Sequence, residues 1–140
     1  MRSYLNWTRF VALCLILFCQ FQVVQAEEFL EPEQAFSVKA KMSAPQVVEV
    51  QFMIAEGYYL YKDRLKFTAV GAELGRPEIP EGKVHFDDGL QKNVETYRRG
   101  FVVRIPVKST KAFVLKVTRQ GCADKGLCFP PLTSSLLINK

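Results

Sequence analysis

The sequence has few of the residues on which catalytic and ligand sites usually depend. It contains one histidine, His85, and only two cysteines after residue 26, Cys122 and Cys128. It has no phosphate-binding glycine loop and no nicotinamide or flavin fingerprint. We therefore expect no cofactor, and any electrons that the chain carries must come from elsewhere. A metal site at His85 and the two cysteines is disfavoured, because the separation is wide and no fourth ligand is evident.

The chain after residue 26 also lacks a helical apolar stripe and a basic block with interleaved aromatic residues. The formal net charge is +5, and it falls to +3 without residues 1–26, which hold two arginines and no acidic residue. A balance this mild, without a basic patch, does not indicate a nucleic-acid partner. We expect a monomer.

The only long apolar run is short and lies near the N-terminus. The run covers residues 10–19, which are all apolar, and Arg2 and Arg9 precede it. Ala26 supplies a small residue at a suitable cleavage point. This arrangement is typical of a secretory signal peptide. A membrane span needs about 20 residues, so an uncleaved anchor is the weaker alternative. We therefore expect residues 1–26 to be a signal peptide, residues 27–140 to form one domain, and the site of action to be the periplasm.

Most of the remaining chain alternates between apolar and polar residues, which is the pattern of half-buried β-strands. Turns rich in glycine, proline and serine separate the alternating segments at regular intervals. The sequence thus predicts an all-β domain, built as a β-sandwich. The expected strands cover residues 36–42, 48–54, 58–61, 65–69, 84–86, 101–107, 113–117 and 136–138.

The segment from Gly121 to Pro131 holds both remaining cysteines, with a Lys-Gly pair between them. We interpret it as a β-hairpin with one sulfur on each arm. Opposed residues on antiparallel strands have Cα atoms about 4.5–5.5 Å apart, and a disulfide needs about 4.4–6.8 Å. The spacing therefore suits a Cys122–Cys128 disulfide that can open and close without much backbone movement.

The spacing alone leaves two roles open for this pair. A structural disulfide is the usual role in an exported protein. However, a bond across so short a loop stabilises the fold by only about 2–2.5 kcal/mol in the loop-entropy model. The sequence Phe129-Pro130-Pro131 also suggests a strand edge that a partner thiol could reach, because proline cannot donate to a ladder. Thiol–disulfide exchange is therefore the second role. Lys125 and Arg119 would favour a thiolate there, whereas Asp124 would oppose it.

Four segments resemble the periplasmic N-terminal domain of the thiol:disulfide interchange protein DsbD family. They are Glu33-Gln34-Ala35-Phe36, Gly57-Tyr58-Tyr59-Leu60-Tyr61-Lys62, Val94-Glu95-Thr96-Tyr97-Arg98 and, most specifically, the run from Gln120 to Pro131. The resemblance spans Pro32 to Leu136. It implies an immunoglobulin-like β-sandwich with the cysteine pair on an inserted, redox-active hairpin.

The resemblance also implies a function, that of a protein-disulfide reductase component acting as a relay. A membrane-linked thioredoxin-like donor would reduce the domain. The domain would then pass electrons to oxidised periplasmic thioredoxin-fold proteins, including a disulfide isomerase and a cytochrome c maturation reductase. By analogy, Cys128 forms the mixed disulfide and Cys122 resolves it. The residues expected around this catalytic pair are Tyr59, Tyr61, Asp88, Leu90 and Phe129.

Two features differ from the family pattern. The loop that covers the cysteines in the family often has an aromatic residue at its tip, whereas the matching loop here has Leu90. The family normally continues into membrane helices and a thioredoxin domain, whereas this sequence stops at Lys140. We expect a free-standing relay, a truncated version or a fragment, whose reductant then acts in trans. A secreted immunoglobulin-like binding module with a structural disulfide is the alternative function, since this architecture serves many purposes.

Overall fold

The computed structural model describes residues 29–109 and 111–139 of the 140-residue chain. The signal peptide predicted at residues 1–26 lies outside the described residues and stays a prediction. Within the described part, none of the helices has the length and apolar character needed to cross a membrane.

The described residues form a chain of strands with one short helix and one 3-10 turn. In chain order the elements are α2 (Pro32–Ala35), β1 (Phe36–Ala44), β2 (Val47–Ile54), β3 (Tyr58–Tyr61), η1 (Lys62–Arg64), β4 (Lys66–Val70), β5 (Glu73–Leu74), β6 (Lys83–Asp87), β7 (Lys92–Tyr97), β8 (Phe101–Lys108), β9 (Phe113–Arg119), β10 (Gly121–Ala123) and β11 (Leu132–Ile138).

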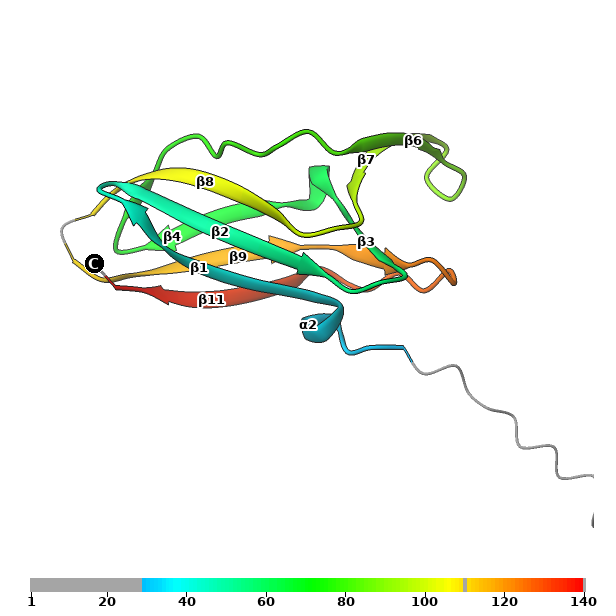
Figure 1. Cartoon of the computed structure of the whole chain (residues 1–140), viewed down its shortest axis with the longest axis horizontal. Helices are drawn as coiled ribbons and strands as arrows, with labels where there is room; N and C mark the ends of the chain where they lie inside the picture. The colour runs from blue at the N-terminus through cyan, green and yellow to red at the C-terminus, as the bar shows by residue number, and fades with distance from the viewer. Residues whose placement is uncertain (1–28, 110, 140) are drawn as a thin grey trace, which may run out of the picture.

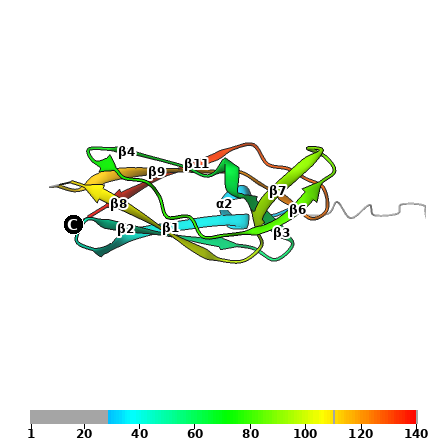
Figure 2. The same cartoon turned by 90° about the horizontal axis from the view of Figure 1, so that it is seen from above.

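Two sheets pack face to face and form the sandwich. One has the strand order β1-β2-β8-β5 and the other has the order β11-β9-β4, with antiparallel pairing throughout. Figure 2 shows β4, β9 and β11 on one side of the molecule and β1, β2 and β8 on the other. The immunoglobulin-like sandwich expected from the sequence is confirmed by this arrangement.

The core lies between these two sheets and follows from their alternation. Every second residue of β2, β8 and β9 is buried, while the residues between them are mostly exposed or half-buried. Side chains of a strand alternate between its two faces, so one face supplies the apolar core. In these three strands, the fully or almost fully buried apolar side chains are Val48, Val50, Phe52, Val103, Ile105, Val107, Phe113, Leu115 and Val117.

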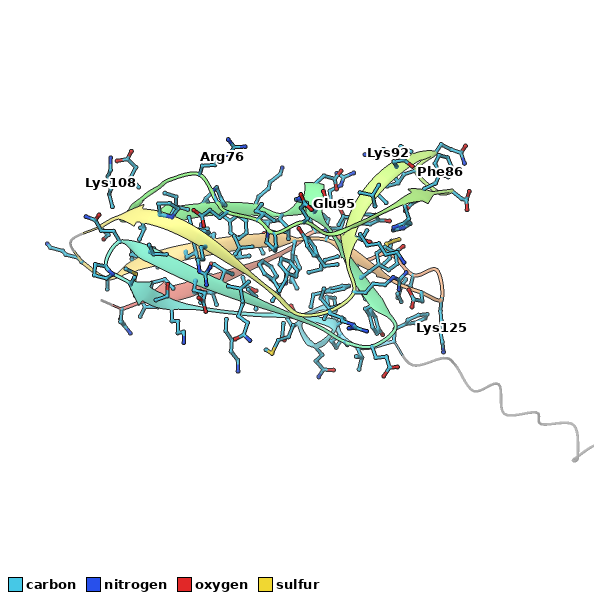
Figure 3. All side chains as sticks on the ribbon, turned by 45° about the horizontal axis from the view of Figure 1, so that its top comes forward. Arg76, Phe86, Lys92, Glu95, Lys108 and Lys125 are labelled. Atoms are coloured by element: carbon cyan, nitrogen blue, oxygen red, sulfur yellow. A yellow bond between two sulfur atoms is a disulfide. The ribbon has the colours of Figure 1, made fainter. Side chains whose placement is uncertain are left out.

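A third sheet lies at one end of the sandwich and carries the cysteine hairpin. Its strand order is β10-β3-β7-β6. Figure 1 shows β3, β6 and β7 at the end of the molecule opposite the C-terminus. In Figure 3, Lys92 at the start of β7 and Lys125 in the hairpin loop lie at this same end, and Lys108 lies at the other. We call it the terminal sheet.

The structure adds elements that alternation did not predict. β7 runs from Lys92 to Tyr97, where no strand was expected, and α2 covers Pro32–Ala35 directly before β1. The connection 71–82 contains the short strand β5. The second arm of the cysteine hairpin is also shorter than a strand, because Cys128 pairs with Cys122 through an isolated bridge.

Candidate redox-active site

The cysteine hairpin turns through a three-residue loop, Asp124-Lys125-Gly126. The Gly126 N–H donates to the Ala123 carbonyl at 3.0 Å, and the Ala123 N–H donates to the Leu127 carbonyl at 2.7 Å. Gly126 has φ of +94°, a conformation that glycine adopts at little cost. A turn followed by a left-handed glycine is a common way to close a hairpin loop of this length.

The disulfide joins Cys122 to Cys128, as the spacing predicted. The hydrogen bonds on either side of the pair, Ala123 N–H to Leu127 and Phe129 N–H to Gly121, leave the two cysteines as a non-hydrogen-bonded pair. Their Cα atoms are 4.0 Å apart, which is closer than the 4.5–5.5 Å expected for opposed strand residues. The sulfur atoms therefore meet across the narrow position of the ladder.

The two cysteines differ sharply in accessibility. Cys122 lies in β10 and is 1% exposed, whereas Cys128 lies on the outer arm and is exposed. A thiolate that attacks a disulfide must reach one sulfur along the S–S axis, so access decides which sulfur reacts. Of the two cysteines, only Cys128 is an exposed residue, so its sulfur is the one that an attacking thiolate can reach.

The register of the terminal sheet gathers polar and aromatic side chains beside Cys122. Cys122 is the Cα partner of Tyr59, and Tyr61 follows on the same face of β3. The pairing of β3 with β7 and of β7 with β6 extends this face across the sheet. We call it the redox face, and its members include Cys122, Tyr59, Tyr61, Thr96, Val94, His85 and Asp87.

Tyr61 connects the buried sulfur to a carboxylate. Its hydroxyl oxygen lies 3.7 Å from the Cys122 Sγ and donates to the Asp87 Oδ2 at 2.8 Å. A sulfur in a disulfide carries no proton, so the sulfur contact is not a hydrogen bond donated by Cys122. Tyr61, Val94 and Cys122 form a small buried cluster against Tyr59, separate from the main core.

Burial and hydrogen bonds shift the pKa values of Tyr61 and Asp87. Burial, followed by contacts with Tyr59 and Asp87, raises the pKa of Tyr61 far above its ordinary value, so its hydroxyl stays protonated. The Leu90 N–H donates to the Asp87 Oδ1 at 2.8 Å, and this bond together with the Tyr61 hydroxyl lowers the pKa of Asp87. Tyr61 is therefore a permanent donor, and Asp87 is a carboxylate above acid pH.

The residues expected around the cysteines lie in three different places. Tyr59 and Tyr61 lie on the redox face beside Cys122. Asp88 and Leu90 lie in the exposed loop between β6 and β7, and Leu90 is 43% exposed. Phe129, although adjacent to Cys128 in sequence, is 9% exposed and packs in the main core against Phe36 with ring centroids 5.7 Å apart.

Sequence reasoning missed three residues of the redox face and its rim. Asp87, rather than its neighbour Asp88, reaches the Tyr61 hydroxyl. His85 lies two residues earlier on the same strand face, with its ring centroid 6.5 Å from that of Tyr59. Arg98 extends over the Tyr59 ring, with its Cζ 4.9 Å from the ring centroid. The two-residue spacing of His85 and Asp87 places both on one face of a strand. Only the pairing of that strand with β7 shows that this face is the redox face.

The described residues contain no group of three or more histidine, cysteine, aspartate and glutamate side chains arranged to hold a metal ion. His85 instead lies with its Nδ1 3.5 Å from the Thr96 Oγ1.

Known proteins with similar sequences share one description. The family described as "Thiol:disulfide interchange protein DsbD, N-terminal" matches residues 26–140. DsbD of Ralstonia nicotianae is 48% identical over 112 residues, which cover 78% of this chain and 18% of that protein. DsbD 1 of Pseudomonas aeruginosa is 41% identical over 109 residues, covering 75% of this chain and 18% of its own length. The chain thus spans about a fifth of the length of the curated relatives it matches.

Solved structures agree with the sequence comparison. The N-terminal domain of Neisseria meningitidis DsbD in its reduced form has a TM-score of 0.71 and 31% identity, covering 80% of this chain and 90% of that domain. The same domain in a complex with the N-terminal domain of PilB gives a TM-score of 0.67 and 30% identity, covering 80% and 88% of the two chains. This chain therefore belongs to the family of the N-terminal domain of the thiol:disulfide interchange protein DsbD.

Proposed function

We propose that this chain is a periplasmic thiol–disulfide interchange module that relays two electrons at a time through Cys122 and Cys128. The donor is a membrane-linked thioredoxin-like protein, and the acceptors are oxidised periplasmic thioredoxin-fold proteins such as a disulfide isomerase and a cytochrome c maturation reductase. The observation that carries the proposal is the contrast between an exposed Cys128 and a Cys122 that is 1% exposed. The complex of a related domain with PilB supports a role in contacts with other proteins.

In the reducing half of the cycle, a donor thiolate attacks the Cys128 sulfur. The Cys122–Cys128 bond breaks, and Cys122 leaves as a thiolate that takes up a proton. The donor's second thiol then attacks the donor sulfur of the mixed disulfide and releases Cys128. The donor ends as a disulfide and this chain as a dithiol, so two electrons and two protons are transferred.

In the delivering half, the Cys128 thiolate attacks the disulfide of an acceptor and displaces one acceptor sulfur. Cys122 then attacks the Cys128 sulfur, restores the intramolecular disulfide and releases the acceptor as a dithiol. The buried position of Cys122 suits this second step, because it lies across the ladder from Cys128 and away from competing thiols. Tyr61, whose hydroxyl lies 3.7 Å from the Cys122 Sγ, would donate to the thiolate that forms there by turning its single O–H away from Asp87.

The residues around the cysteine pair support and shield it. Tyr59 supports Cys122 from the neighbouring strand, and Phe129 anchors the outer arm in the core directly after Cys128. Leu90 is proposed as a loose apolar shield at the tip of the β6–β7 loop, and Asp88 contributes charge to the same loop. Asp87, the neighbour of Asp88, is the carboxylate that accepts the hydrogen bond of Tyr61.

A redox titration tests the proposal. The chain without residues 1–26 should equilibrate with glutathione or thioredoxin buffers, since exchange-active disulfides have higher potentials than structural ones. A potential far below about −300 mV would mark a structural bond and reject the relay.

A trapping experiment identifies the reacting sulfur. Cys122→Ser should leave Cys128 able to form a mixed disulfide that cannot be resolved, and it should capture thioredoxin-fold proteins from periplasmic extracts. The matched variant Cys128→Ser keeps only the buried thiol and should capture none. If both variants capture nothing and Cys128→Ser simply loses stability, a binding module with a structural disulfide is the better description.

A further inference from the structure

Arg98 contacts both the hairpin loop and the aromatic residue beside the disulfide. It is the first residue after β7. Its Nη1 donates to the Asp124 Oδ1 at 2.5 Å, and its Cζ lies 4.9 Å from the centre of the Tyr59 ring. Tyr59 is in turn the Cα partner of Cys122. One guanidinium group therefore joins the tip of the cysteine hairpin to the strand that supports the buried sulfur.

The charge of Asp124 matters because of where it lies. Asp124 is two residues from Cys122 and begins the loop that leads to Cys128. Thiol–disulfide exchange brings a thiolate to a disulfide, and the negative charge is then shared by three sulfur atoms. An unpaired carboxylate at this loop would repel that charge, whereas a paired one would not.

The ion pair contributes little to stability. Arg98 and Asp124 have side chains that are 49% and 46% exposed, and water and salt screen an ion pair this exposed, so it adds little to the free energy of unfolding. The guanidinium lies over the ring of Tyr59, and this cation–π contact holds it beside β3, the strand that pairs with Cys122. Any benefit of this arrangement is therefore expected in the rate and charge preference of the reaction.

We infer that Arg98 is a specificity-determining residue for exchange at Cys128, because it neutralises Asp124 and keeps the approach to the exposed sulfur open to anionic groups. This inference rests on the proposed function. The partners that it favours carry a thiolate or acidic side chains beside their reactive sulfur. Lys125, in the same loop, is present in every variant considered below and does not distinguish them.

Small disulfides of different charge can test the inference on the native dithiol. The reduced protein would be mixed with an anionic disulfide (5,5′-dithiobis-2-nitrobenzoate), a neutral one (2-hydroxyethyl disulfide) and a cationic one (cystamine). In each reaction Cys128 attacks the reagent, one reagent thiol leaves, and Cys122 closes the protein disulfide and releases the second thiol. The loss of protein thiols after acid quenching gives a rate for each reagent.

The decisive quantity is the ratio of the anionic rate to the cationic rate, because the thiolate fraction of Cys128 cancels in it. In Arg98→Gln this ratio should fall about threefold to tenfold at low ionic strength, as expected for removing one unit charge near a solvent-exposed site. In Asp124→Asn the ratio should rise, and in the double variant it should return close to that of the wild type. At 1 M salt, where the Debye length is about 3 Å, the differences should largely disappear.

Two further variants keep the outcome unambiguous. Arg104→Gln removes another exposed arginine, which pairs with Glu49 on the sandwich, and should leave the ratio unchanged. Arg98→Lys keeps the charge and should retain the wild-type ratio within about twofold. The inference is overturned if Arg98→Gln has the wild-type ratio, or if Arg98→Lys behaves like Arg98→Gln. If the dithiol reacts with none of the reagents in any variant, the proposed function fails instead.

Discussion

The sandwich and the terminal sheet use the same strand alternation but place different chemistry on the face that points away from the core. In β8, the face opposite the buried Val103, Ile105 and Val107 is exposed to solvent. In the terminal sheet, the face opposite the core holds a second buried cluster around Cys122. Within the terminal sheet, β3 and β7 thus bury side chains on both faces, and only the second face combines sulfur, hydroxyl and carboxylate groups.

This difference separates stability from reactivity. Residues of the sandwich core are expected to affect the free energy of unfolding, and residues of the redox face to affect the behaviour of the disulfide. Gly121 lies at the boundary, because it belongs to β10 and is in close contact with Phe36 of the core. Variants in each region therefore test whether the two properties can be changed independently.

The largest effect is expected from Phe52→Ala in the sandwich. Phe52 is fully buried and stacks on Phe101 with ring centroids 4.6 Å apart. Truncating such a side chain costs about 3–5 kcal/mol of unfolding free energy, through lost burial and the cavity that remains. Chemical denaturation should show this loss in both the oxidised and the reduced protein. Exchange rates of the folded fraction should match the wild type, and a changed rate would show that the two regions are coupled.

Gly121→Ala should affect both regions at once. A Cβ at this position would lie 2.7 Å from the Phe36 Cζ and would also clash with the Tyr59 carbonyl oxygen. Overpacking of this kind typically costs about 1–3 kcal/mol. The hairpin must shift to relieve it, so the unfolding free energy and the redox potential should both change. The informative comparison is Gly126→Ala, where the added Cβ meets no atom within 4 Å and the strain comes only from φ of +94°.

Tyr61→Phe should have a smaller effect that depends on pH. It removes the hydrogen bond to Asp87, at a cost of about 1.5 kcal/mol, the lower end of the range for bonds to a charged group, because this bond is only partly buried. The folded-state pKa of Asp87 lies below its unfolded value, so its contribution is present above about pH 4 and is lost as the pH falls through the folded pKa. The difference between wild type and Tyr61→Phe should therefore be larger at pH 6 than at pH 3.

A matched control for this pH dependence is Tyr58→Phe. The Tyr58 hydroxyl accepts a hydrogen bond from the Leu30 N–H at 2.8 Å and is not bonded to Asp87. Its removal should lower the unfolding free energy by a similar amount at both pH values. NMR titration of the Asp87 carboxyl gives the second check, since its pKa should rise in Tyr61→Phe and stay unchanged in Tyr58→Phe. An unchanged Asp87 pKa in Tyr61→Phe would contradict the assigned hydrogen bond.

The same comparison explains what could be predicted from the sequence. Strands such as β2 and β9 have one apolar face, so alternation reveals them and the sandwich follows. The disulfide followed from the short spacing of the two cysteines. β7 was missed because both of its faces mix polar and apolar residues, with Lys92, Val94 and Thr96 on one and Asn93, Glu95 and Tyr97 on the other. A strand with two half-buried faces has no clear period.

The details of the redox face depend on register, which the sequence does not specify locally. Shifting a strand by one residue moves every side chain to the other face. The sequence pointed to Asp88 as a residue near the cysteines. The pairing of β6 with β7 instead places its neighbour Asp87, together with His85, on the redox face. Arg98 could not be identified either, because its contact with Asp124 joins residues 26 positions apart.

The smallest effect is expected from Leu90→Ala, and its size measures how far the β6–β7 loop shields the site. Leu90 is 43% exposed, and the loop contact to the redox face is made by its backbone N–H to Asp87. Truncation keeps that bond, so oxidation of the reduced cysteines by a small disulfide should quicken by no more than about twofold, as reactivity follows access. Leu127→Ala, which truncates a 38% exposed leucine next to Cys128, provides the comparison. A much larger increase in Leu90→Ala alone would mean that this side chain covers the sulfur atoms once the disulfide is reduced. An unchanged rate would mean that the exposed position seen here is kept in both redox states.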